Sequence, residues 1–139
     1  MECYYYKTLY FEKGIFDNII DCTFILTMEN SDRDPITKIK ENPTSKKVII
    51  QYNKGYKKCK KQLVQQKAHC DLADAYFIVF KYANKNNMNN ILVLEDDFIF
   101  NKKINDGKII QDITNLYKEN NVNIFQLGTL NYILNPNSF

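Results

Sequence analysis

Short apolar runs alternate with segments of helical periodicity along the chain, and this alternation restricts the possible folds more than any other feature. The runs at residues 22–28, 47–52 and 91–94 end in polar or turn-forming clusters, which is typical of strands. Residues 60–87 contain no Gly or Pro, which favours a long amphipathic helix. Its apolar positions at helical spacing are Leu72, Ala73, Tyr76, Val79, Phe80 and Ala83. We therefore expect an α/β fold, with a mostly parallel sheet flanked by helices and a strand at 91–94 buried on both faces.

Several further elements complete this prediction. Asp34 before Pro35 indicates an N-cap and a first-turn proline for a short helix within residues 33–41. The apolar pattern predicts another helix over residues 106–118, a last strand over 124–127, and a short continuation of the third run over 98–100. The tyrosine-rich segment at residues 4–11 forms an edge strand, a cover for the sheet or a surface for a partner.

The composition is that of a single soluble globular domain spanning residues 1–139, since 45% of the residues are hydrophobic and 25% are charged. The net charge of +3 is too weak to indicate a nucleic-acid-binding protein, and we expect no nucleic-acid partner. The same charge is compatible with an anionic substrate such as a nucleotide diphosphate.

The four cysteines, Cys3, Cys22, Cys59 and Cys70, lie far apart and include no C-x-x-C pair, which favours a reduced intracellular protein. No signal peptide and no membrane span are evident, so we expect a cytoplasmic protein. The abundance of Asn, Lys, Ile and Tyr suggests a coding sequence rich in A and T, as in some large DNA viruses. In that case the location would be the host cytoplasm.

Three adjacent carboxylates, Glu95, Asp96 and Asp97, follow the apolar run at 91–94. They repel one another and are costly to desolvate, and a divalent cation such as Mn²⁺ or Mg²⁺ would offset that cost. Because strand residues alternate in direction, Glu95 and Asp97 are the natural pair to face one ligand. The alternative is a solvated acidic turn that caps the next element. The position of the triplet at the carboxyl end of a predicted buried strand favours a ligand site.

Residues 91–100, ILVLEDDFIF, resemble the LILEDD segment of glycosyltransferase family 25 and related enzymes with the GT-A fold. This resemblance implies that the acidic motif binds a divalent metal and the diphosphate of a nucleotide sugar, with Asp97 and Glu95 as metal ligands. Residues 24–33 resemble the family's opening strand and the polar turn near the nucleotide. The donor-binding residues implied are Thr27, Glu29, Asn30, Arg33, Glu95 and Asp96.

The resemblance implies a Mn²⁺- or Mg²⁺-dependent hexosyltransferase that uses a UDP- or GDP-sugar and a glycan, protein or lipid acceptor. The resemblance covers about residues 23–128. The Ser-His element expected early in the long helix has only a degenerate match, at residues 69–74. An acceptor-binding part is expected after the acidic motif, but the chain ends at Phe139. We therefore expect a short or partial domain, and no catalytic residue is identified.

Two other functions remain open. One is a non-catalytic binding module with a degenerate transferase fold, and the other is a metal-dependent phosphoryl-transfer or nuclease domain that uses the same carboxylates. A basic run consists of Lys54, Lys57, Lys58, Lys60 and Lys61. It either attracts a diphosphate or an anionic acceptor, or is the solvated start of the long helix, and we favour the second interpretation. Tyr52 and Tyr56 either stack on a base or have structural roles.

Overall fold

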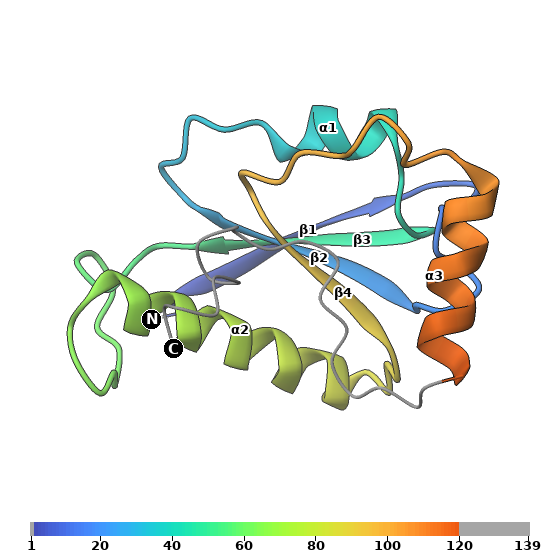
Figure 1. Ribbon diagram of the computed structural model, residues 1–139. Helices are drawn as coiled ribbons and strands as arrows, with labels where there is room; N and C mark the ends of the chain where they lie inside the picture. The colour runs from blue at the N-terminus through green and yellow to red at the C-terminus, as the bar shows by residue number, and fades with distance from the viewer. Residues whose placement is uncertain (1, 120–139) are drawn as a thin grey trace, which may run out of the picture.

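Four strands and three helices form the part of the chain that the computed structural model describes, residues 2–119 (Figure 1). In chain order they are β1 (Tyr4–Tyr10), β2 (Cys22–Met28), α1 (Pro35–Glu41), β3 (Lys47–Asn53), α2 (Ala68–Lys85), β4 (Ile91–Glu95) and α3 (Gly107–Glu119). The α/β class is confirmed. The strand predicted at 124–127 lies outside the described residues.

The sheet has the strand order β1-β3-β2-β4. β2 pairs in parallel with both β3 and β4, whereas β1 pairs antiparallel with β3, so the sheet of the described residues is mixed, with its three central and C-terminal strands parallel as expected. Within the described residues the tyrosine-rich N-terminal segment is thus an edge strand, one of the alternatives that the sequence left open. Because β2, β3 and β4 run in the same direction, their carboxyl ends lie at one edge of the sheet (Figure 1).

Each face of the sheet carries its own apolar core, because successive strand residues point to opposite faces. On one face Phe24 and Leu26 belong to a buried cluster with Val79 of α2. On the other face Ile25 of the same strand belongs to a cluster with Ile39 of α1. α1 and α2 accordingly cover opposite sides of the sheet (Figure 1).

The start of α1 follows the sequence prediction. Asp34 caps the helix by accepting a hydrogen bond at 3.1 Å from the backbone nitrogen of Thr37, and Pro35 opens the first turn. Hydrogen bonds from the side chain and backbone of Thr37 also lower the pKa of Asp34, because they favour its ionised form.

The prediction of a long helix is correct for the centre of α2. It is wrong about where the helix begins and which face is buried. α2 begins at Ala68 instead of residue 60, because residues 54–67 form a loop that is fixed by tertiary contacts. Its buried residues are Asp71, Ala75, Val79 and Ala83, so the expected stripe is rotated. Phe80, which we placed in the core, has 53% of its surface exposed.

Two predictions about β4 are also wrong. Ile91–Leu94 was expected to be buried on both faces, but these residues are only half-buried, because β4 is an edge strand of the described sheet. Residues 98–100 do not continue the strand. The chain turns directly after Glu95, whose carbonyl oxygen accepts a hydrogen bond from the backbone nitrogen of Phe98 at 3.0 Å, and Phe98 then packs against the core on the α1 side.

Cys3 and Cys59 form a disulfide, so the prediction of four reduced cysteines is wrong for this pair. The antiparallel pairing of β1 with β3 places Tyr4 opposite Asn53, and the next backbone contact runs from the nitrogen of Lys54 to the carbonyl oxygen of Cys3 at 3.0 Å. This register brings Cys3 beside the loop that carries Cys59. Within residues 2–119 no helix is long and apolar enough to span a membrane.

Candidate functional site

A cavity of about 570 Å³ lies at the carboxyl ends of the three parallel strands. Its walls come from the ends of β2, β3 and β4 and from the loops that follow them, and the first turns of α2 close one side. The volume is within the range of small-molecule and cofactor sites. Of the predicted donor-binding residues, Thr27, Asn30, Arg33, Glu95 and Asp96 line the cavity, whereas Glu29 does not.

Asp96 ties the turn after β4 to the loop after β2. It is 6% exposed, and its carboxylate accepts hydrogen bonds from the hydroxyls of Thr27 and Ser31 at 2.7 and 2.9 Å and from Arg33 Nη1 at 2.8 Å. Lys38 of α1 donates to the backbone oxygen of Asp96 at 3.3 Å. These contacts join β2, α1 and β4 around one buried carboxylate.

The pKa of Asp96 reflects this environment. Burial alone raises the pKa, but the hydrogen bonds from Thr27, Arg33 and Ser31 outweigh burial and hold the pKa below its ordinary value of 3.8. Asp96 is therefore ionised at neutral pH. Its contribution to folding is fully present above the pKa of the unfolded chain, and is lost as the pH falls through the lower pKa of the folded chain.

Replacing Asp96 by Asn will lower the free energy of unfolding by about 2 kcal/mol at pH 7, because the charge-assisted hydrogen bonds to the carboxylate are lost. Urea unfolding at pH 7 and pH 3 measures the effect. The difference from the wild type shrinks at the lower pH, where the wild-type carboxyl is becoming protonated. The matched control is Asp97→Asn, at the exposed neighbouring residue. Equal stability of Asp96→Asn and Asp97→Asn would contradict a stabilising role for the Asp96 carboxylate.

Glu95 and Asp97 lie in different surroundings from Asp96. Glu95 lines the cavity and accepts a hydrogen bond from the Tyr76 hydroxyl at 3.0 Å, while Asp97 is exposed and does not line the cavity. Burial and the adjacent Glu95 charge raise the pKa of Tyr76 to about 12, so it remains a donor at neutral pH. Alternation along the strand ends at Glu95, where the chain turns. The proposed pairing of Glu95 and Asp97 on one ligand stays a prediction.

Residues 54–61, which we call the basic strap, cross the carboxyl end of β3. Lys54, Lys57 and Lys58 line the cavity, and Lys60 does not. The interpretation of these lysines as the solvated start of a helix is wrong, because the strap is a loop. Tyr56 lines the cavity as well, whereas Tyr52 stacks on Tyr5 with ring centroids 4.9 Å apart.

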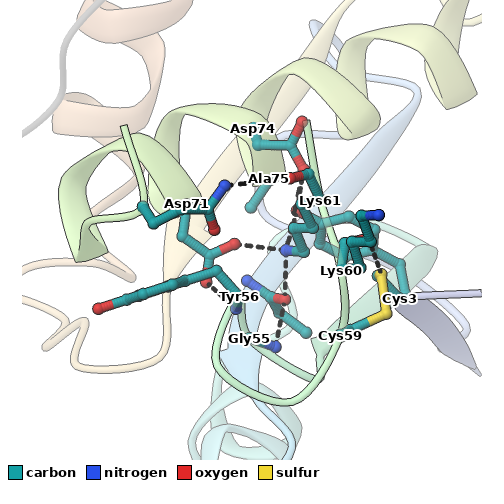
Figure 2. Close-up of polar contacts among 12 residues, drawn as sticks. Cys3, Gly55, Tyr56, Cys59, Lys60, Lys61, Asp71, Asp74 and Ala75 are labelled. Carbon is teal, nitrogen blue, oxygen red and sulfur yellow. Dashed lines mark hydrogen bonds and ion pairs between the residues drawn. A yellow bond between two sulfur atoms is a disulfide. The ribbon is translucent and has the colours of Figure 1, made fainter. Parts of the chain in front are cut away.

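Lys61, the last residue of the strap, turns inward (Figure 2). Its side chain is 4% exposed and forms an ion pair with Asp71, whose side chain is 5% exposed. Lys61 Nζ also donates hydrogen bonds at 2.7 Å to Asn53 Oδ1 and to the Tyr4 hydroxyl. Tyr4 in turn donates to Asp74 at 2.6 Å, and its burial together with this hydrogen bond raises the pKa of Tyr4.

The sequence analysis missed Asp71, which also lines the cavity and accepts a hydrogen bond from the backbone nitrogen of Tyr56 at 3.2 Å. A signal was present, because Asp71 has the same four-residue spacing as Ala75, Val79 and Ala83. An acidic residue in phase with small apolar residues indicates a carboxylate on the buried face of a helix, where it needs a partner.

The carboxylates of this site are poorly arranged to bind a metal ion without ligands from a substrate. Among residues 2–119 no three Asp, Glu, His or Cys side chains lie together as ligands. Asp96 is occupied by Arg33, Thr27 and Ser31, so Glu95 is the carboxylate of the triplet left to face the cavity. Mg²⁺ is commonly held by one or two carboxylates plus substrate phosphates, so a metal at Glu95 would need most of its ligands from the donor and from water.

No protein-family model, no curated protein and no solved structure matches this chain.

Proposed function

We propose that the cavity binds a nucleotide sugar and that the chain is a GT-A-like glycosyltransferase domain. The observation that carries the proposal is the position of the cavity at the carboxyl ends of three parallel strands, lined by five of the six residues that the resemblance implies for donor binding. Ligands of open α/β sheets bind at this edge. The basic side chains at the cavity suit a diphosphate, and Tyr56 offers a ring on which a base can stack.

Metal dependence is a separate part of the proposal. The resemblance implies Mn²⁺ or Mg²⁺ at Asp97 and Glu95, and of these two residues Glu95 lines the cavity. When bound, such an ion stabilises the leaving diphosphate.

Isothermal titration with UDP, GDP and their hexose conjugates tests donor binding, first in EDTA and then with Mn²⁺. We expect one of the two nucleotide families to bind more tightly than its free nucleoside, because the diphosphate supplies most of the charge. If the metal binds as implied, Mn²⁺ will tighten binding in the wild type, and Glu95→Gln and Asp97→Asn will each remove that gain. An unchanged gain in Asp97→Asn would contradict the role of Asp97. Failure of every nucleotide sugar to bind would overturn the proposal.

A non-catalytic binding module is the second candidate, and the pairing of the cavity carboxylates favours it. Besides Glu95, the acidic residues that line the cavity are Asp71 and Asp96, and both are in ion pairs. A carboxylate held in an ion pair is a poor base for an acceptor hydroxyl, because its partner lowers its basicity. Mass spectrometry of mixtures with a nucleotide sugar distinguishes the two functions. A module leaves the sugar nucleotide intact, whereas a transferase releases the nucleotide.

A further inference from the structure

We infer that three lysines of the basic strap, Lys54, Lys57 and Lys58, bind a diphosphate in the cavity without a divalent cation. The inference deepens the proposed function and rests on it for the identity of the whole ligand. The ligand class that it names is wider, namely a phosphate-bearing anion.

The charges around the cavity favour an anion. Among the described residues four basic side chains line it, and one of them, Arg33, is paired with Asp96. Asp71 is paired with Lys61, which lies outside the lining. Three lysines then remain against the single carboxylate of Glu95, and no ion pair within residues 2–119 involves any of the three. An excess of positive charge in a hollow attracts and concentrates anions.

The strap is held in place before any ligand arrives (Figure 2). At its start, Gly55 has a φ of +83°, and its backbone nitrogen donates to Asn53 Oδ1 at 2.8 Å. In its middle, the Tyr56 nitrogen donates to Asp71. At its end, Cys59 is joined to Cys3 and Lys61 is buried against Asp71. With its backbone fixed on both sides of Lys57 and Lys58, the strap loses less conformational entropy on binding than a free loop.

Gly55 is required for this shape. A side chain there would meet a positive φ, and its Cβ would lie 2.8 Å from the terminal methyl of Met28. The Met28 side chain, at the end of β2, therefore reaches the backbone of the strap. Arg33, on the loop after β2, is 53% exposed and uses Nη1 for Asp96. Its other guanidinium hydrogens are free to reach an anion held by the lysines.

The test uses inorganic pyrophosphate and UDP as probes in buffer with EDTA, with affinity measured by isothermal titration. Lys57→Ala/Lys58→Ala removes two lining charges. Lys60→Ala/Lys67→Ala is the matched control, because it removes two exposed charges from the same loop that do not line the cavity. We expect the wild type to bind both probes without metal. The first variant should lose about tenfold or more in affinity while the control changes little, as expected for charge-assisted contacts of this kind. Thermal unfolding checks that both variants are folded.

The outcomes separate this inference from the proposed function. Binding of UDP-sugars that requires Mn²⁺ and is unaffected by Lys57→Ala/Lys58→Ala would overturn the inference and leave the proposed function standing. Lysine-dependent binding of pyrophosphate with no preference for nucleotide sugars would support the inference and overturn the proposed function. Equal losses in the test and control variants, or no binding of pyrophosphate by the wild type, would also overturn the inference.

Discussion

Replacing Lys61 by Met will lower the free energy of unfolding by about 3–5 kcal/mol, because it leaves the carboxylate of Asp71 buried without its partner. The pair is almost completely enclosed, and the Lys61 ammonium group also lies 4.1 Å from the centre of the Tyr4 ring. Loss of the ammonium group removes hydrogen bonds to Tyr4 and Asn53 as well. Urea unfolding monitored by circular dichroism measures the change.

A double-mutant cycle with Asp71→Asn refines this prediction. The double variant should be less destabilised than the sum of the two single variants, because neither buried charge is then left alone. Lys60→Met is the control, since its exposed side chain is next in sequence. If Lys61→Met is no less stable than Lys60→Met, the buried ion pair is not what holds the end of the basic strap.

Reducing the Cys3–Cys59 disulfide will cost about 4 kcal/mol of stability in the chain-entropy model, because the bond joins residues 56 positions apart. The cost arises mainly in the unfolded chain, which gains freedom when this long loop opens. Urea unfolding with and without a dithiol reductant measures it, and mass spectrometry counts the thiols.

The variant Cys3→Ala/Cys59→Ala should have the stability of the reduced wild type and should not respond to the reductant. Cys70→Ala is the control, because Cys70 is a free, half-buried cysteine. A wild type whose urea midpoint is insensitive to reductant, although its thiol count rises, would contradict the prediction.

Sequence periodicity predicted the elements whose ends are set by local chemistry. β2 has the predicted bounds, and β3 and β4 each extend one residue further than predicted. The polar cluster that follows each apolar run marks where its strand ends. α1 begins after its Asp34 cap for the same local reason. The start of α2 and the disulfide could not be predicted in this way, because both depend on β1 lying beside β3, and that pairing joins distant parts of the chain.

The location of the candidate site could be predicted from the sequence, but the roles of its carboxylates could not. Its location followed from topology, since parallel strands bring their carboxyl ends together and place Thr27 near Glu95. The role of each carboxylate did not follow. The turn after Glu95 directs Asp96 into hydrogen bonds with the β2 loop, and Asp71 is engaged by a lysine ten residues earlier in the chain. These partners are tertiary, so spacing along the sequence did not reveal them.

The pairing of β4 with the outer edge of β2 has a consequence for biosynthesis. While the chain is emerging from the ribosome, β1, β2 and β3 can pair before residues 91–95 exist, which leaves one edge of β2 open. The residue that fastens the β2 loop, Asp96, is made directly after β4. The cavity therefore gains the wall formed by Glu95 and Asp96 only once residues 91–96 have been made, and a nascent chain arrested before β4 has the basic strap but lacks that wall.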